Sequence, residues 1–186
     1  APNHRLKLFE RDLYLRQFQG YLDREVKAGS RILDAGGGVG RFSGEFLRRG
    51  YEVVLMDASE RALKIALGYF AREEFRNYSL FLGDAHDLQA FPDNSFDALA
   101  AVELLCYCTD PEQVVREMKR VVVPDGWMFF SVEGKYGSLL TDSKIGIGAP
   151  SGPSGSTIAG IRLFGAIFRN SGSNWSPLPI STRCRV

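Results

Sequence analysis

Residues 31–41, Arg31-Ile32-Leu33-Asp34-Ala35-Gly36-Gly37-Gly38-Val39-Gly40-Arg41, decide the fold of this chain. A short apolar run ends at Asp34 and passes directly into glycines, and helical character resumes at about Val39. A strand that enters a helix through glycines presents free backbone N–H groups at the carboxyl edge of a sheet. Glycine lacks a Cβ atom and tolerates positive φ, so a nucleoside-type ligand can approach this backbone closely. The stretch predicts such a ligand-binding turn or, as the simpler alternative, a tight strand–helix connection.

The spacing of the glycines discriminates between cofactors. Gly36, Gly38 and Gly40 alternate with other residues, whereas the dinucleotide fingerprint requires glycine or alanine at position 41, which is Arg41. A P-loop would continue with Gly-Lys-Ser or Gly-Lys-Thr, and no such sequence follows. The pattern therefore weakens the interpretation of the chain as an NAD-dependent oxidoreductase and argues against a P-loop nucleotide site.

Strand-like and helix-like segments alternate outward from this stretch. Expected strands cover about residues 31–34, 51–56, 79–82, 95–102 and 127–132, and expected helices cover about residues 5–27, 39–49, 59–71 and 110–122. Strands that alternate with helices of this length form βαβ units and a parallel sheet. The sequence predicts an α/β, Rossmann-like doubly wound fold with a mainly parallel sheet of at least five strands and helices on both faces.

Two of the expected helices begin at recognisable caps. Ser59 precedes the helix over 59–71 as an N-cap. Before the helix over 110–122, Asp110 is placed to cap and Pro111 occupies the first helical position. Gln113 is placed to reach back to residue 110, as in a capping box. These signals predict where the two helices begin.

The chain resembles a known family at these residues. Residues 32–40 look like motif I of the class I S-adenosylmethionine-dependent methyltransferases, and residues 84–132 resemble the type 11 branch, which includes ubiquinone/menaquinone-biosynthesis methyltransferases. The similarity extends over about residues 20–134. It implies S-adenosylmethionine as the cofactor, S-adenosylhomocysteine as the product, and in-line transfer of a methyl group to oxygen, nitrogen or carbon of a small molecule.

Three carboxylates lie at successive strand ends of the expected sheet. Asp57, followed by Ala58, is placed to accept hydrogen bonds from both hydroxyls of a ribose. The resemblance implies that Asp84 accepts a hydrogen bond from the adenine amino group, while the backbone N–H of Ala85 meets the ring. Asp34 has two alternative roles, either to orient the glycine loop or to contact the methionine amino group. The predicted cofactor site consists of Asp34, Gly36, Gly38, Gly40, Asp57, Ala58, Asp84, Ala85 and Val102.

The segment after the fourth expected strand is the predicted acceptor side. Val102 and Glu103 lie where a backbone carbonyl would approach the amino-acid end of the cofactor. Members of the resembled family often carry Glu-His where this chain has Cys106-Tyr107. This chain therefore lacks the imidazole that often lies near the substrate in the family. Tyr107 is the candidate catalytic residue, and it either lines the methyl-transfer site or packs under the loop.

General-base and metal-ligand candidates are scarce in this sequence. His86, beside Asp84, is interpreted as a loop residue, and Cys106 and Cys108 as small buried apolar side chains. A sulfonium is already an activated methyl donor, so the main requirements are alignment of the reacting groups and exclusion of water. No catalytic metal is expected.

The chain divides into three expected parts. Residues 1–30 form an N-terminal helical segment, interpreted as a substrate-side cap, and residues 31–134 form the S-adenosylmethionine-binding core. Residues 135–186 form an atypical Gly/Ser-rich basic tail: residues 143–186 contain five basic and no acidic side chains, against 18 basic and 22 acidic in residues 1–142. The antiparallel hairpin that would complete the family's sheet is not recognisable there, and its presence is left open. A non-catalytic cofactor-binding or regulatory protein with an incomplete fold is therefore the alternative function.

Composition sets further bounds on partners and location. The net charge of +1 over 186 residues provides no overall basic field, so nucleic-acid binding is not favoured. No apolar run is long enough to span a membrane, and the first residues lack the apolar stretch of a secretory signal. Three cysteines match neither a disulfide framework nor a zinc-ligand spacing, which indicates a cytoplasmic location.

Overall fold

A computed structural model describes residues 12, 14–15, 22–133, 155–158, 161–171 and 174–178 of the chain. The elements are β1 (Arg31–Ala35), α2 (Arg41–Arg48), β2 (Glu52–Asp57), α3 (Glu60–Arg72), β3 (Tyr78–Leu82), β4 (Phe96–Val102), the short 3₁₀ helix η1 (Leu105–Tyr107), α4 (Pro111–Val121), β5 (Val122–Glu133), β6 (Gly155–Ile158), β7 (Ile161–Ser171) and β8 (Asn174–Leu178). The alternation of strands and helices predicted for residues 31–132 is confirmed.

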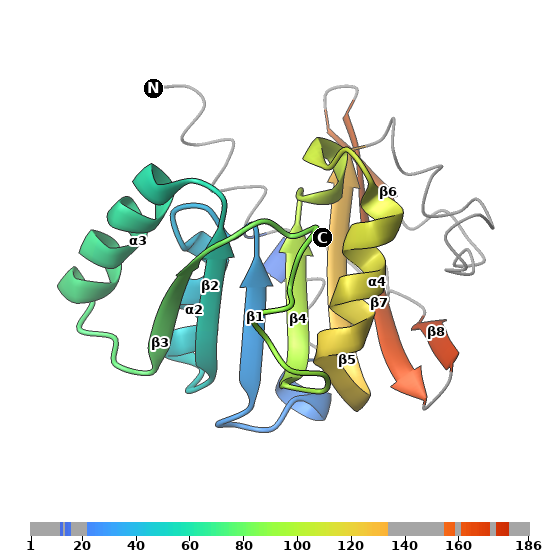
Figure 1. Cartoon of the computed structure of the whole chain (residues 1–186), viewed down its shortest axis with the longest axis horizontal. Helices are drawn as coiled ribbons and strands as arrows, with labels where there is room; N and C mark the ends of the chain where they lie inside the picture. Colours follow the sequence, from blue (N-terminus) through green and yellow to red (C-terminus); the bar gives the residue numbers. More distant parts are fainter. Residues whose placement is uncertain are drawn as a thin grey trace.

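The described strands form one sheet in the order β3-β2-β1-β4-β5-β7-β6, and β8 pairs with β7 (Figure 1). Strands β1 to β5 are mutually parallel, whereas β7 runs antiparallel to β5 and to β6. The α/β, doubly wound, mainly parallel sheet is therefore confirmed. The chain order reverses between β1 and β4, and in open α/β sheets ligands bind outside the carboxyl ends of the strands at such a switch point.

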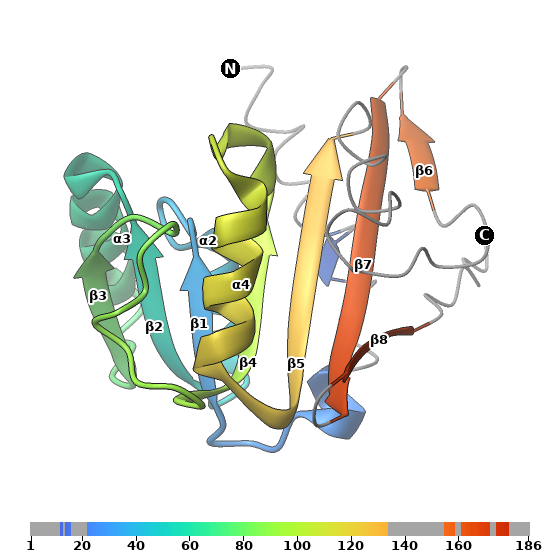
Figure 2. The same cartoon turned by 45° about the vertical axis from the view of Figure 1, so that its right-hand side comes forward.

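Helices cover both faces of the sheet, as Figure 2 shows for α4 on one side and α2 and α3 on the other. Side chains alternate between the faces along each strand, because successive Cβ atoms point in opposite directions. Leu33 packs in the cluster with α4, whereas Ile32 packs in the cluster with α2 and α3. Tyr14 and Leu22, from the N-terminal segment, are buried in the α2–α3 cluster. Both clusters enclose the strands that carry the site residues.

The N-terminal helix predicted over 5–27 lies only partly within the described residues. Residues 12, 14, 15 and 22–25 are helical, and the remainder of the predicted span lies outside the described part of the chain. No helix in the described residues is long and apolar enough to cross a membrane.

The predicted helix starts are confirmed, with one correction. The Ser59 hydroxyl accepts a hydrogen bond from the N–H of Ala62 (3.2 Å), and the Asp110 carboxylate accepts one from the N–H of Gln113 (2.9 Å). The predicted reach-back of the Gln113 side chain is wrong: its amide donates to the carbonyl of His86 instead (3.3 Å). The N–H of Asp110 that it would have satisfied already donates to the His86 ring (3.2 Å).

Two features near the C-terminal side of the sheet differ from the sequence analysis. Strand β5 begins at Val122, five residues before the predicted start, because the expected turn is a bulge within the strand. Phe96 pairs with Val122 and Ala98 with Trp127, so residues 123–126 bulge out and Asp125 adopts a φ of 64°. The open question of the antiparallel pair is also answered, since β6 and β7 form it and β7 pairs with β5.

Candidate functional site

A cavity of about 680 Å³ lies at the carboxyl ends of β1, β2, β3 and β4. Its size is within the range typical of small-molecule and cofactor sites. Four segments, one after each of these strands, supply its walls. The lining residues are Asp34, Gly36, Gly37, Gly38, Val39, Arg41, Phe42, Met56, Asp57, Ala58, Gly83, Asp84, Ala85, His86, Val102, Glu103, Leu104, Tyr107, Cys108 and Thr109.

The glycine loop after β1 is attached to the end of β2 by backbone hydrogen bonds. The N–H groups of Gly36 and Gly37 both donate to the carbonyl of Met56, at 2.8 and 3.1 Å. The three alternating glycines have positive φ (67°, 57° and 79° for Gly36, Gly38 and Gly40), a conformation that costs other residues strain. The alternating glycines noted in the sequence therefore mark the positions where the backbone adopts a left-handed conformation.

Asp34 lies beneath this loop and is only 1% exposed. Its Oδ2 accepts hydrogen bonds from the hydroxyl (2.6 Å) and the N–H (3.0 Å) of Ser43 in α2. Burial raises the pKa of Asp34 to about 6, and the two hydrogen bonds from Ser43 act in the opposite direction. Asp34 thus joins β1 to α2 under the loop, and it also borders the cavity.

Asp57 ties the glycine loop to the start of α3. Its Oδ2 accepts the N–H of Gly38 (2.8 Å), and its Oδ1 accepts the N–H of Ser59 (2.8 Å). A carboxylate offers about four acceptor positions, so two such bonds leave capacity for a ligand's hydroxyl groups. The backbone contacts hold the carboxylate at the cavity wall, where the sequence analysis expects a ribose.

Asp84 and His86 form a polar pair at the wall after β3. Asp84 Oδ1 accepts hydrogen bonds from the backbone N–H of His86 (2.9 Å) and from the ring nitrogen Nδ1 (2.6 Å). These two bonds, the backbone one first, hold the pKa of Asp84 below its usual value. The other ring nitrogen, Nε2, accepts the N–H of Asp110 (3.2 Å) and lies 3.3 Å from the Thr109 hydroxyl.

The segment after β4 forms the remaining wall. Glu103 has a φ of 57°, and its N–H donates to the carbonyl and the hydroxyl of Ser131 in β5 (3.1 and 3.0 Å). Tyr107, in η1, is 80% exposed and borders the cavity, so the alternative that it packs under the loop is wrong. Burial, followed by the nearby charge of Asp84, raises the pKa of the Cys108 thiol to about 11.

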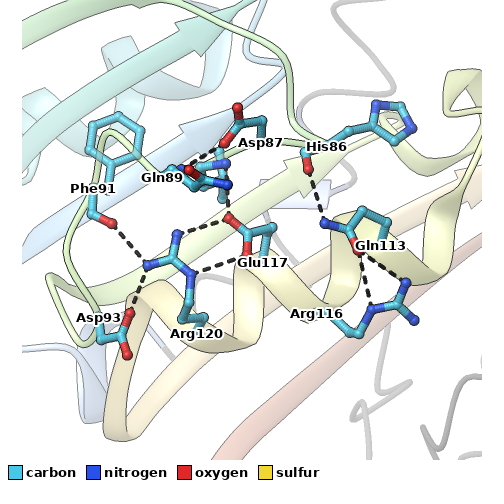
Figure 3. Close-up of polar contacts among 10 residues, drawn as sticks. His86, Asp87, Gln89, Phe91, Asp93, Gln113, Arg116, Glu117 and Arg120 are labelled. Atoms are coloured by element: carbon cyan, nitrogen blue, oxygen red, sulfur yellow. Dashed lines mark hydrogen bonds and ion pairs between the residues drawn. The ribbon is translucent and has the colours of Figure 1, made fainter.

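Helix α4 holds the loop that follows Asp84, as Figure 3 shows. Glu117 accepts the N–H of Leu88 (3.0 Å), and Arg120 donates to the carbonyl of Phe91 (3.0 Å) and to the carboxylate of Asp93 (2.7 Å). Glu117 and Arg120 also pair with each other at 2.8 Å. The loop between β3 and β4 is therefore fixed to α4 along its length.

The structure brings most of the predicted site residues together. Asp34, Gly36, Gly38, Asp57, Ala58, Asp84, Ala85, Val102 and Tyr107 all line the cavity. Gly40 lies outside the lining: it is the N-cap residue of α2, and a Cβ atom there would meet the Phe70 ring at 2.6 Å. The cavity residues that the sequence analysis did not assign to the site include Arg41, Phe42, Met56 and Leu104. Met56 and Leu104 lie within two residues of the ends of β2 and β4, whereas Arg41 and Phe42 begin α2 directly after the glycine loop. These positions are the signal that could have found them.

The residues of the cavity fit a nucleoside-type cofactor. Positive-φ glycines form one wall without side chains, and carboxylates from two adjacent strand ends offer acceptors for hydroxyl and amino groups. Asp84 Oδ2 accepts no hydrogen bond from the described residues and is available to a ligand. Within the described part of the chain, no group of three or more His, Cys, Asp or Glu residues is arranged to hold a metal ion.

Fold and site together define a Rossmann-like domain with a cofactor cavity at its topological switch point. Residues 33–130, more than half of the chain, match the family model described as a methyltransferase domain, of the type 11 branch. The chain therefore belongs to the class I S-adenosylmethionine-dependent methyltransferases. The resemblance found in the sequence is confirmed, and the oxidoreductase alternative is set aside.

Individual relatives agree with this assignment. The chain is 33% identical over 116 residues to the ubiquinone biosynthesis O-methyltransferase of Chromobacterium violaceum, which covers 60% of this chain and 48% of that protein. It is 34% identical over 119 residues to a sterol 24-C-methyltransferase of Aspergillus fumigatus, covering 63% and 30%. The chain thus spans about half or less of the length of these curated relatives.

Solved structures share the fold. The [4+2]-cyclase SpnF superimposes with a TM-score of 0.58 at 25% identity, over 66% of this chain and 43% of that one. The YcgJ protein from Bacillus subtilis superimposes with a TM-score of 0.58 at 23% identity, over 63% and 50%. The latter similarity concerns the fold alone.

Proposed function

We propose that this chain binds S-adenosylmethionine in the cavity at the ends of β1 to β4 and transfers its methyl group to a small molecule by in-line displacement. The carrying observation is the convergence of Asp57 and Asp84, from adjacent strand ends, on the cavity that the glycine loop also lines. Membership in the methyltransferase family supports the same cofactor.

The residues of the cavity have distinct proposed roles. Asp57 would accept hydrogen bonds from the ribose, and Asp84 Oδ2 would accept from the adenine amino group. The glycine loop and the backbone near Val102 would receive the amino-acid end. When bound, the cofactor supplies a methyl group that is already activated by its sulfonium. The chain's own task is then to align the acceptor and to exclude water.

Neither His86 nor Cys108 is suited to act as a base or nucleophile in this reaction. Both ring nitrogens of His86 are engaged, one with Asp84 and one with the N–H of Asp110. The Cys108 thiol, with a pKa raised to about 11, is protonated near neutral pH. Tyr107 remains the proposed acceptor-side residue, because its exposed ring borders the cavity. Because neither His86 nor Cys108 is suited to act as a base, the proposed acceptor is one that needs little proton removal by the protein.

Titration calorimetry with S-adenosylhomocysteine tests the proposal. We expect binding by the wild-type chain and an affinity at least tenfold lower for Asp57→Ala, since a charge-assisted hydrogen bond contributes about 1.5–3 kcal/mol. Glu60→Ala is the control, because Glu60 pairs with Lys64 on the exposed surface of α3 and does not line the cavity. Absence of binding by the wild type, or equal binding by Asp57→Ala, would overturn the proposal.

The alternative of a cofactor-binding protein without catalysis has lost its main support, because the β6–β7 pair is present. One specific comparison makes a chain without methyl-transfer activity worth testing, since SpnF shares the fold and is named a [4+2]-cyclase, which is an activity other than methyl transfer. Retained S-adenosylhomocysteine binding without methyl transfer to a panel of phenols, amines and carbon nucleophiles would favour this alternative. The substrate-side role of residues 1–30 and a cytoplasmic location also stay predictions.

A further inference from the structure

We propose that His86 is a positioning residue that holds the Asp84 carboxylate at the cavity wall. The backbone N–H of Asp110, the N-cap residue of α4, keeps the His86 ring in the Nδ1–H tautomer. The cofactor role of Asp84 rests on the proposed function, whereas the tautomer and the contact with Asp84 do not.

The hydrogen bonds at Nε2 determine the state of the ring. A backbone N–H can only donate, so Nε2, which accepts the N–H of Asp110 at 3.2 Å, must carry no proton. In a neutral imidazole the proton then sits on Nδ1, because the bond made by one ring nitrogen sets the state of the other. Nδ1 lies 2.6 Å from Asp84 Oδ1, where an N–H is required.

The contact at Nδ1 restricts the Asp84 side chain. Oδ1 receives both the ring N–H and the backbone N–H of His86, at 2.6 and 2.9 Å. Two donors on one oxygen leave the carboxylate little freedom to rotate, and they leave Oδ2 as the oxygen available to a ligand. The Asp84 side chain is otherwise largely exposed, at 67%, so the described packing around it would not hold it in place.

The same ring joins two walls of the cavity. Asp84 and His86 follow β3, whereas Thr109 and Asp110 precede α4. The Gln113 amide adds a second link between these segments by donating to the His86 carbonyl, as seen in Figure 3. In a capping box, the side chain three residues after the N-cap accepts the N–H of the N-cap residue. In α4 the ring of His86 accepts this N–H instead. The imidazole therefore takes its orientation from α4 and transmits it to Asp84.

Two substitutions test the roles of the two ring nitrogens separately. The amide nitrogen of His86→Asn falls near the position of Nδ1 and can still donate to Asp84. The amide oxygen of His86→Gln falls near Nε2 and can still accept the N–H of Asp110, but no donor remains for Asp84. We expect His86→Gln and His86→Ala to bind S-adenosylhomocysteine about tenfold more weakly than the wild type, and His86→Asn to recover most of that loss.

Two measurements test the proposal. The chain has two histidines, so His4→Ala leaves a single imidazole, and ¹⁵N NMR of the ligand-free protein then reports its tautomer directly. We expect the Nδ1–H form. In a double-mutant cycle, we expect His86→Ala to lower the S-adenosylhomocysteine affinity in the wild-type background but to change it little in an Asp84→Ala background. Thermal unfolding of each variant checks that the fold is retained.

The outcomes are distinct. The Nε2–H tautomer, an equal loss of affinity in both backgrounds, or full binding by His86→Gln would each overturn the positioning role. If the wild-type chain binds no S-adenosylhomocysteine, the proposed function fails, and the tautomer alone then decides whether His86 holds Asp84.

Discussion

The carboxylate of Asp34 and the hydroxyl of Ser43 form a hydrogen bond of 2.6 Å between β1 and α2, where both residues are buried. The N–H of Ser43 donates to the same oxygen, Oδ2, at 3.0 Å. Asp34 is thereby joined to the helix that follows the glycine loop, and the loop passes over it. A buried carboxylate is costly unless donors compensate it, so Ser43 is central to the stability of this part of the site.

Removal of the Ser43 hydroxyl should destabilise the protein. Ser43→Ala keeps the backbone donor but leaves the buried carboxylate with one donor fewer, at a cost of about 1–3 kcal/mol. Urea unfolding at pH 7.5 measures the change. Ser79→Ala, at an exposed position of β3, is the control and should change the free energy of unfolding by less than about 0.5 kcal/mol. A Ser43→Ala protein as stable as this control would contradict the prediction.

The raised pKa of Asp34 predicts a pH-dependent stability. Its pKa is about 6 in the folded chain against an ordinary value of 3.8, so the folded state binds the proton more tightly than the unfolded state. The resulting stabilisation is fully present below about pH 3.8 and is lost as the pH rises through about 6. Between pH 4.5 and 7.5 the loss amounts to about 2 kcal/mol.

Asp34→Asn isolates this contribution, because an amide does not titrate. Relative to the wild type, Asp34→Asn should become more stable by about 2 kcal/mol between pH 4.5 and pH 7.5. Urea unfolding at the two pH values provides the measurement, and the difference between the proteins cancels the titration of all other groups. A difference that is independent of pH would show that Asp34 titrates normally.

The parts of the site that the sequence predicted depend on short-range patterns. Asp57 and Asp84 could be placed at the site because each lies at the end of an apolar strand, and parallel strands bring their ends to one edge. The role expected of Asp84 came from the family resemblance. The role of His86 depends on Asp110, 24 residues later, and this pairing leaves no local signal. For the same reason Gln113 was assigned to a capping box, since the sequence cannot show that another side chain already occupies the N–H of residue 110.

The C-terminal strands illustrate a second limit. Residues 123–126 contain Pro124-Asp125-Gly126, which is a turn signal, yet the chain bulges and remains in β5. Likewise, the segment over 155–171 is rich in glycine and serine near its start. Its strand β7 pairs with residues of β5 that lie 30 or more positions earlier in the sequence. Strand pairing over such distances is a tertiary property that local composition does not report.

A methyl group at Gly37 should disrupt the glycine loop. A Cβ atom there would overlap the Leu55 side chain and lie 2.6 Å from Asp34 Oδ2. Gly37→Ala is therefore expected to lower the free energy of unfolding by about 1–3 kcal/mol, as overpacking does in other cores. Gly68→Ala is the matched control: its Cβ atom would meet nothing within 4 Å in α3, and alanine favours helix by about 0.5–1 kcal/mol. Thermal unfolding should separate the two variants in opposite directions, and a Gly37→Ala protein that matches the control would refute the close approach.

Removal of the Glu117 carboxylate should release the loop that follows Asp84. Glu117→Ala leaves the N–H of the buried Leu88 without its acceptor and breaks the pair with Arg120. We expect hydrogen exchange at residues 84–93 to accelerate about tenfold or more, which corresponds to about 1.4 kcal/mol of local stability. Glu112→Ala, in the same helix, removes an ion pair of 3.9 Å between residues that are 49% and 61% exposed, and should leave exchange in this loop unchanged. If both variants exchange alike, α4 does not hold the loop through Glu117. If only Glu117→Ala accelerates exchange, its affinity for S-adenosylhomocysteine should also fall, because the loop that follows Asp84 is then no longer held in place by α4.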